Sequence, residues 1–244
     1  MSQPSIWLRP PESLSLQNGE VHVWRMELEQ PRDLLEKFRG TLEPDELQRA
    51  DRFHFEKHRS SFVVGRGFLR YVLSRYLETE PEALKFSYGE YGKPALDGRL
   101  HFNMSHSHRV ALLAITEDRQ IGVDVEHIRA DFATADIARR FFSAAEVESF
   151  ESLTKEEQVE AFFRCWTRKE AFIKATGKGL SQPLDAFDVT LAPGVAAELL
   201  RVEEDDASRW FMSDIDAGSD YAAALVVEGA AVQIRYWSAT DYKG

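Results

Sequence analysis

Two charged side chains, Glu170 and Lys174, interrupt the apolar face of a predicted helix. At about 100° per residue, Phe162, Trp166 and Ile173 share one narrow stripe, and Glu170 falls in the middle of it. Burying a carboxylate on an apolar face is unfavourable unless a cation lies next to it. An exposed Glu–Lys pair four residues apart stabilises a helix by only about 0.3–0.5 kcal/mol. We therefore interpret Glu170 and Lys174 as functional candidates that pair with each other. A solvated salt bridge on the helix surface is the alternative.

A second acidic pair, Asp124 and Glu126, lies in the segment IGVDVE. Alternation along a strand buries its three branched side chains on one face and sends both carboxylates to the other, about 7 Å apart. Two such carboxylates repel each other unless a cation lies between them. Oxygen ligands of this kind suit Mg²⁺, which keeps several water ligands and completes its coordination with the phosphates of a substrate. If strand and helix meet, Glu170 completes a metal and proton-transfer set. A strand with a wet polar face is the alternative.

The elements that must position these residues have recognisable ends. Thr154 and Glu157 form a predicted capping box at the start of the helix, and Gly177 is placed to end it in a left-handed conformation. Further upstream, YGKP marks a turn with Lys93 at its tip. Ser105 and His106 follow in HFNMSHSH, which we interpret as a polar loop opening onto a buried strand over residues 110–115.

The rest of the chain alternates between helices and strands. A half-buried strand is predicted over residues 21–28, a helix from Pro31 and a helical pattern over residues 44–77. Arg59 and Arg66 belong to a run of cations in this pattern, which is either an anion-binding face or a set of solvated charges. Further strands are expected at residues 189–191, 197–202, 210–215, 221–227 and 231–237.

The order of these elements repeats in outline, helices and then strands, in each half of the chain. This predicts an α+β protein of two similar α/β subdomains, residues 1–120 and 121–244, with the active site in the cleft between them. Two such halves in one chain are enough to build the cleft, so a monomer is expected.

Composition restricts the environment and the partners. The 244 residues are 43% hydrophobic and carry a formal net charge of −11, which opposes binding to nucleic acid and to anionic membranes. Cys165 is the single cysteine, so the chain forms no internal disulfide. The first residues lack a secretion signal, and no stretch approaches the roughly 18 apolar residues of a membrane span. We expect a cytoplasmic protein.

Several other kinds of site lack their motifs. His101, His106 and His108 have no matching cysteines, and their spacing fits no zinc pattern. The sequence contains neither the GxxxxGK[ST] of a nucleotide-binding P-loop nor the GxSxG of a serine hydrolase.

Taken in order, FNMSHS, IGVDVE and FFRCWTRKEAFIKATGKGL, with YGKP before them and LSQPLDAFDV after them, resemble the Sfp-type 4′-phosphopantetheinyl transferases. The resemblance is specific over about residues 44–190 and looser elsewhere. It implies the pseudo-twofold fold of that family. It also implies transfer of the phosphopantetheine arm of coenzyme A to a serine hydroxyl of an acyl or peptidyl carrier protein, which leaves 3′,5′-ADP.

The resemblance also implies roles for the acidic residues and the lysine. Asp124, Glu126 and Glu170 would hold Mg²⁺, or Mn²⁺ in its place, at the pyrophosphate. Glu170 would also serve as, or orient, the base for the carrier serine. Lys174 would neutralise the leaving phosphate and help to protonate it.

By the same resemblance, Lys93, Ser105 and His106 would contact the nucleotide end of coenzyme A. Members of the family often carry an arginine directly before the phenylalanine of the second helix, where this chain has Ser61. Arg59 or Arg66 is then the candidate for the 3′-phosphate.

Two other functions fit part of this pattern. Acidic residues on a strand followed by a Glu and a Lys also describe a Mg²⁺-dependent phosphodiesterase or nuclease, although the net charge and the missing basic stripe argue against nucleic acid. A non-catalytic module that binds coenzyme A or a carrier protein is the other alternative, but it would not need Glu170 and Lys174 on an apolar face.

Overall fold

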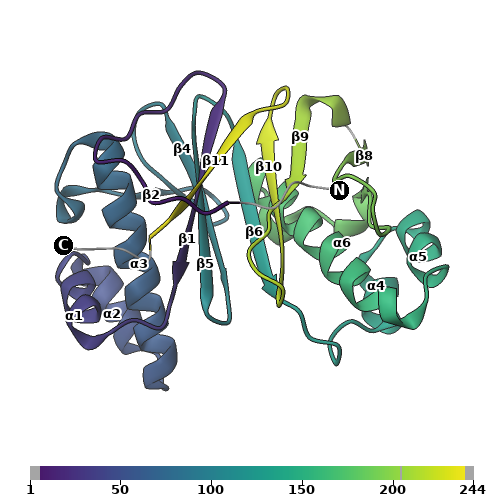
Figure 1. Ribbon diagram of the computed structural model, residues 1–244, viewed down its shortest axis with the longest axis horizontal. Coiled ribbons are helices and arrows are strands. Elements are labelled where there is room, and N and C mark those ends of the chain that lie inside the picture. The colour runs from purple at the N-terminus through teal and green to yellow at the C-terminus, as the bar shows by residue number, and fades with distance from the viewer. Residues whose placement is uncertain (1–5, 204, 240–244) are drawn as a thin grey trace.

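The computed structural model describes residues 6–203 and 205–239. Helices lie at both sides of the molecule and most of the strands lie between them (Figure 1). The helices are α1 (Arg32–Gly40), α2 (Pro44–Asp51), α3 (Glu56–Leu77), α4 (Ala135–Phe141), α5 (Ala144–Glu151) and α6 (Lys155–Thr176). The strands are β1 (Glu20–Glu27), β2 (Ser87–Tyr88), β3 (Pro94–Ala95), β4 (Leu100–Ser107), β5 (Val110–Glu117), β6 (Ile121–His127), β7 (Phe187–Val189), β8 (Leu199–Val202), β9 (Trp210–Asp214), β10 (Tyr221–Glu228) and β11 (Gln233–Ser238).

Two sheets form the centre of the molecule. The N-terminal sheet has the order β11-β1-β5-β4, and the C-terminal sheet has the order β6-β10-β9. The sheets meet where β4 and β6 lie side by side, joined by side chains of β4. There, the Asn103 side-chain oxygen accepts the backbone N–H of Val123 at 2.9 Å. The two small remaining sheets are the hairpins β2-β3 and β7-β8.

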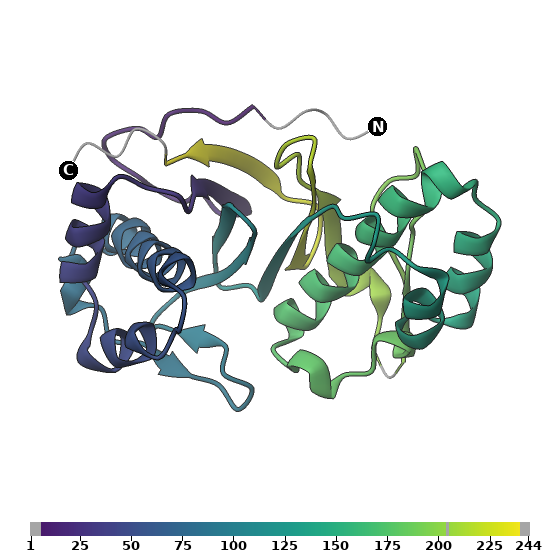
Figure 2. The ribbon, with the colours of Figure 1, turned by 90° about the horizontal axis from the view of Figure 1, so that it is seen from below.

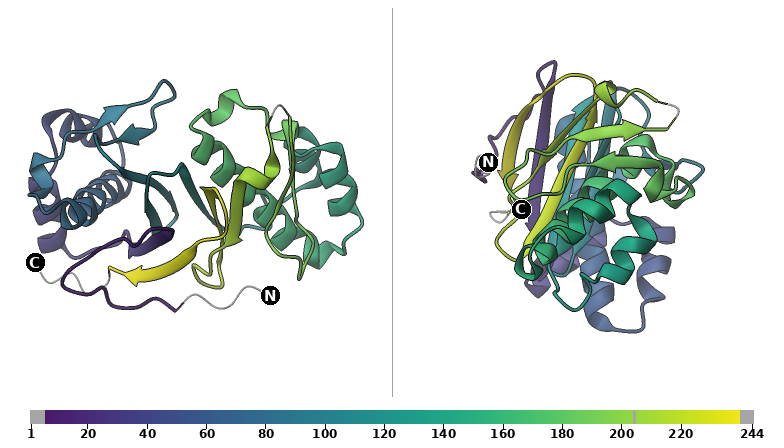
Figure 3. Two further views of the ribbon diagram at one scale, coloured as in Figure 1. Left: turned by 90° about the horizontal axis from the view of Figure 1, so that it is seen from above. Right: turned by 90° about the vertical axis from the view of Figure 1, so that its right-hand side faces the viewer.

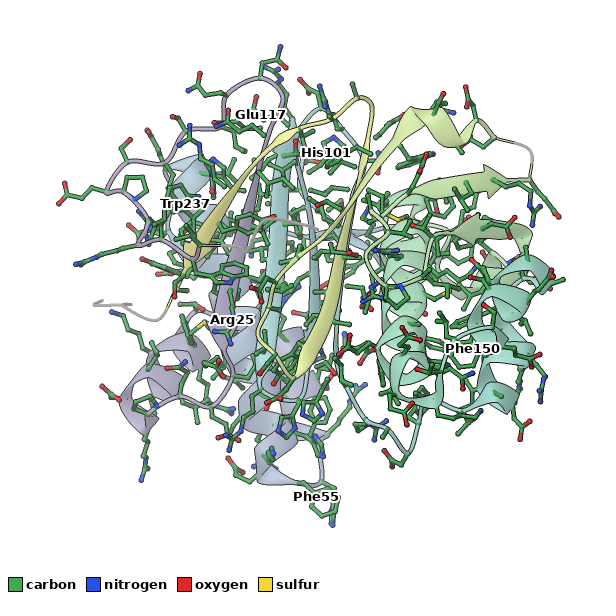
Figure 4. The ribbon with its side chains drawn as sticks, turned by 45° about the vertical axis from the view of Figure 1, so that its right-hand side comes forward. Arg25, Phe55, His101, Glu117, Phe150 and Trp237 are labelled. Atoms are coloured by element: carbon green, nitrogen blue, oxygen red, sulfur yellow. The ribbon has the colours of Figure 1, made fainter. Side chains whose placement is uncertain are left out.

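Three apolar cores follow from this layering (Figure 2). One core lies between the N-terminal sheet and α1 to α3 and contains Trp24, Phe68 and Trp237. A second lies between the C-terminal sheet and α4 to α6 and contains Phe150. The third fills the space between the sheets with branched residues of β1, β5, β6 and β10. Trp237 and Phe150 accordingly lie on opposite sides of the strands (Figure 4).

The α+β class expected from the sequence is confirmed, and each side contributes one helix of 22 residues, α3 or α6. The expected boundary at residues 120 and 121 falls between β5 and β6. However, β11, which follows the C-terminal sheet in the chain, belongs to the N-terminal sheet. It pairs in parallel with β1, with Trp237 beside Trp24. Figure 3 shows β11 and the segment before β1 running along the same side of the molecule.

The interpretation of HFNMSHSH as a loop is wrong, because residues 100–107 form β4. Its pattern is alternating. Leu100, Phe102 and Met104 pack into the core against α3, whereas Ser105 and Ser107 reach the carboxylates of β6. Asn103, Ser105 and Ser107 therefore lie on one face of a strand and His106 on the other, and none of them lies in a loop.

The predicted helical stretch over residues 44–77 is two helices, α2 and α3, separated by residues 52–55. Among the residues that the structure describes, no helix combines the length and the apolar character that a bilayer crossing needs.

Candidate active site

Gly122 allows α6 to lie directly on β6. A Cβ atom at this position would be 2.0 Å from the backbone oxygen of Ala171 and 2.4 Å from the backbone nitrogen of Ala175. Only glycine leaves room for so close an approach of helix and strand. Two residues further along β6, Asp124 points to the same face as Gly122, so its carboxylate lies under the C-terminal half of α6.

Lys174 meets Asp124 at this crossing. Its ammonium group lies 2.6 Å from Asp124 Oδ1 and donates to the Ser105 hydroxyl at 2.9 Å. The Ser105 hydroxyl itself donates to the same carboxylate oxygen at 2.8 Å. The expected ion pair between Glu170 and Lys174 is thus replaced by one between Lys174 and Asp124, because Asp124 is only 2% exposed and has the greater need of a cation.

The two glutamates complete a group of three carboxylates. Burial, reinforced by the negative charge of Asp124, raises the pKa of Glu170 to about 7. Burial and the charge of Asp124 also raise the pKa of Glu126, which accepts the Ser107 hydroxyl at 2.8 Å. Each glutamate is therefore near enough to Asp124 to sense its charge, and the strand and the helix bring the acidic residues together.

One atom of this group is suited to a cation. Asp124 Oδ2 is buried and makes no hydrogen bond with any part of the chain that the structure describes. A buried carboxylate oxygen without a partner is unfavourable, and a hard cation is the partner that such an oxygen accepts best. Within residues 6–203 and 205–239, no three His, Cys, Asp or Glu side chains are already arranged as a metal site. The donor chemistry fits Mg²⁺, but the ligands would have to converge on it.

Lys93 lies behind this group, at the end of α6. Its ammonium donates to the backbone oxygens of Lys174 at 2.8 Å, Ile121 at 3.0 Å and Ala175 at 3.3 Å. Burial lowers its pKa to about 8. Lys93 therefore ties the β2-β3 hairpin to the C-terminus of α6 and to the start of β6, a favourable place for a cation. A pocket of about 170 Å³ opens between the two halves here, with Lys93, Asn103 and Lys174 in its lining.

The other three nucleotide-contact candidates are His106, Arg59 and Arg66. His106 lies on the face of β4 that is opposite to the face of Ser105. Loss of water contacts lowers the pKa of His106, and the nearby Lys174 ammonium lowers it further. Arg66 pairs with Glu46, donates to the Tyr88 hydroxyl at 2.8 Å and stacks on the Phe86 ring.

Arg59 makes its contacts near the N-terminal end of α3. It donates to Glu56 at 3.0 Å and to the backbone oxygen of Phe53 at 3.3 Å. Of the sequence candidates, the structure thus joins Ser105, Asp124 and Lys174 by direct contacts and places Glu126, Glu170 and Lys93 around them. Arg59 and Arg66 make their contacts elsewhere.

Sequence reasoning missed three residues that hold the site in place. Asn103 and Ser107, on either side of Ser105, form hydrogen bonds that join β4 to β6. Lys169, next to Glu170, is fully buried and contacts the carboxylate of Glu146 at 2.8 Å and the backbone oxygens of Leu184 and Phe187. The polar alternation of residues 103, 105 and 107 was the available signal for the first two.

Comparison with protein families matches two regions of the chain. Residues 120–226 match the 4′-phosphopantetheinyl transferase superfamily. Residues 29–118 match the N-terminal region of a 4′-phosphopantetheinyl transferase. The two matches together include β4, β5 and the crossing of α6 with β6, whereas β1 and β11 lie outside the matched residues.

Individual relatives are similar over long stretches. The 4′-phosphopantetheinyl transferase HetI of a Nostoc species is 41% identical over 236 residues, which are 95% of this chain and 97% of the relative. Sfp of Bacillus subtilis is 36% identical over 158 residues, 64% of this chain and 69% of its own. Among solved structures, the Thermotoga maritima holo-[acyl-carrier-protein] synthase covers 45% of this chain and 62% of its own, at 23% identity and a TM-score of 0.35. From its likeness to HetI over nearly its whole length, the chain belongs to the 4′-phosphopantetheinyl transferase family.

Proposed function

We propose that the crossing of α6 and β6 is where the phosphopantetheine arm of coenzyme A is transferred to a carrier protein serine. The observation that carries the proposal is Glu170, a carboxylate whose pKa is raised to about 7, placed beside the Lys174 and Asp124 ion pair. A base and a cation at one place are what attack on a pyrophosphate requires.

Glu170 acts as the general base. A pKa near neutrality lets a carboxylate accept a proton from an incoming hydroxyl and still be ionised beforehand in a large share of molecules. The serine oxygen then forms a bond to the phosphorus next to pantetheine, the bond from this phosphorus to the bridging oxygen breaks, and 3′,5′-ADP leaves. Lys174, whose side chain is 28% exposed, offsets the charge that grows on the leaving phosphate.

Asp124, Glu126 and Glu170 are the residues that would hold Mg²⁺, with Mn²⁺ as a substitute. The unpartnered Asp124 Oδ2 supports this choice. When bound, the ion would neutralise the pyrophosphate and act as a Lewis acid on it. Three ionised carboxylates and one ammonium carry two net negative charges, which a divalent cation balances.

Coenzyme A enters through the pocket lined by Lys93, Asn103 and Lys174. Ser105 and His106 lie on the two faces of β4 beside this path, so they remain candidates for its nucleotide end. Arg59 and Arg66 also remain candidates for the 3′-phosphate, although each already pairs with a carboxylate.

The test is to incubate the protein with coenzyme A, Mg²⁺ and an apo acyl or peptidyl carrier protein and to weigh the carrier by mass spectrometry. The carrier should gain one phosphopantetheine. Glu170→Gln, which keeps the shape and removes the base, should lower the rate by about 100-fold or more, with a thermal midpoint no lower than that of the unmodified protein. Transfer at the full rate by this variant would exclude Glu170 as the base.

A further inference from the structure

Lys174 contacts the same buried carboxylate that the metal ion would use. Its ammonium lies 2.6 Å from Asp124 Oδ1, while Oδ2 of this residue has no partner among the described residues. Lys174 and Ser105 therefore supply the contacts that stabilise the buried charge of Asp124. The ammonium serves as the internal counter-ion of the site.

A counter-ion on a ligand opposes a second cation there. The ammonium and a divalent ion on one carboxylate repel each other strongly, since little water lies around Asp124 to screen them. Metal binding therefore becomes favourable when Lys174 leaves Asp124 for another anion. A pyrophosphate is such an anion, because its oxygens accept an ammonium readily.

We propose that Lys174 makes metal binding depend on coenzyme A: the lysine holds Asp124 in the free enzyme and releases it when a pyrophosphate enters. This inference rests on the proposed metal and pyrophosphate site. Coupling of this kind is reciprocal, so coenzyme A should raise the affinity for metal by the same factor by which metal raises the affinity for coenzyme A.

The backbone around Lys174 supports a movement of the side chain alone. Lys93 holds the backbone oxygens of Lys174 and Ala175, and the missing side chain of Gly122 keeps α6 in contact with β6. The helix end is thus fixed on two sides. The Lys174 side chain is 28% exposed and has a flexible four-carbon stem. Its ammonium can change partner without a shift of the helix.

Binding of Mn²⁺ tests the proposal without turnover. It is measured through the loss of the electron paramagnetic resonance signal of the free ion. The titration is made with and without coenzyme A and in the absence of any carrier protein, and the complex of Mn²⁺ with free coenzyme A is measured separately. The proteins are the unmodified chain, Lys174→Gln, Lys174→Arg and Lys155→Gln. The last removes one charge from the exposed other end of α6 and controls for net charge.

We expect the unmodified chain and Lys155→Gln to bind Mn²⁺ at least tenfold more tightly when coenzyme A is present. Lys174→Gln should bind Mn²⁺ at least tenfold more tightly than the unmodified chain without coenzyme A, and coenzyme A should raise this affinity by a smaller factor than in the unmodified chain. Lys174→Arg keeps the charge and should keep the dependence.

Equal Mn²⁺ affinity of Lys174→Gln and the unmodified chain without coenzyme A would overturn the counter-ion proposal and leave the metal site standing. Loss of Mn²⁺ binding in a Lys174→Gln protein that is still folded at the temperature of the titration would also overturn it, because Lys174 would then support the ion. If the unmodified chain bound no Mn²⁺ under either condition, the proposed metal site itself would be wrong.

Discussion

Lys174 of α6 and Asp124 of β6 form an ion pair of 2.6 Å that joins the helix to the strand at the centre of the proposed active site. Asp124 is 2% exposed, so its negative charge depends on this contact and on the Ser105 hydroxyl. The pair is thus part of the fold as well as of the proposed chemistry, and stability should report on it.

Removing one member of the pair should destabilise the protein more than removing both. Lys174→Met leaves the buried Asp124 charge without its cation and should lower the free energy of unfolding by about 3 kcal/mol. Asp124→Ala leaves a partly exposed ammonium and should cost about 1–3 kcal/mol. Urea unfolding of the two single variants and the double variant measures the coupling. Strictly additive losses would show that the two side chains do not stabilise each other.

Glu170 should give both rate and stability a pH dependence. Its pKa is raised from 4.5 to about 7, chiefly by burial. The transfer rate should also rise with pH as the base ionises, but at a pH below about 7 once Mg²⁺ is bound, because the ion favours the ionised carboxylate. A group whose pKa is raised on folding stabilises the folded state most below its unfolded value. The stability contributed by Glu170 should therefore fall as the pH increases from 4.5 to about 7.

Thermal midpoints of the unmodified protein and Glu170→Gln, measured without metal across this pH range, separate the stability effect. As the pH rises, the thermal midpoint of the unmodified chain should fall relative to that of Glu170→Gln. A constant difference would mean that Glu170 titrates at the ordinary pKa of a glutamate.

Gly122→Ala should separate α6 from β6. The added methyl group would lie 2.0 Å from the backbone oxygen of Ala171, so the helix must move. We expect a loss of about 1–3 kcal/mol in the free energy of unfolding and a transfer rate lower by about 100-fold, from chemical unfolding and the carrier assay. Gly40→Ala is the matched control, because a Cβ there meets nothing within 4 Å. An unchanged rate in Gly122→Ala would show that the contact between helix and strand is unimportant for transfer.

Lys93→Met should weaken the end of α6. It removes three contacts to backbone oxygens and should cost about 1–3 kcal/mol. Burial lowers the pKa of Lys93 from 10.5 to about 8, so the folded state loses this proton before the unfolded state does. The stability of the unmodified chain relative to Lys93→Met should thus rise between pH 8 and pH 10.5.

Thermal midpoints measure this effect, with Lys178→Met, a change of an exposed lysine near the same helix end, as the control. Coenzyme A titration of the same variants shows whether Lys93 also serves the ligand. Equal midpoints of Lys93→Met and the control would show that the contacts of Lys93 do not stabilise the end of α6.

Local patterns predicted the elements that carry the site. The capping box of Thr154 and Glu157 and the left-handed Gly177 mark the ends of α6 as expected, because caps depend on neighbouring residues alone. Alternation placed Asp124 and Glu126 correctly on one face of β6, opposite to the branched residues of the inner core. These are properties of single elements, which a short stretch of sequence determines.

Contacts between elements were beyond such patterns. Helical spacing offered Glu170 as the partner of Lys174, but the choice of Asp124 depends on how closely α6 lies on β6 and on how deeply Asp124 is buried. The polar face of β4 looked like a loop because its cover, β6, comes later in the chain. The three nucleotide-contact candidates outside the central group depend on the same tertiary arrangement.

The parallel pairing of β11 with β1 also has a consequence for how the protein is made. A ribosome produces β1 long before β11, so one edge of β1 has no partner in its own sheet while most of the chain is synthesised. Such an edge, rich in buried residues such as Val21 and Val23, invites pairing with other chains. Interrupted synthesis before residue 233 would leave this edge open permanently, and the incomplete chains should aggregate or be degraded rather than persist as a partly active enzyme.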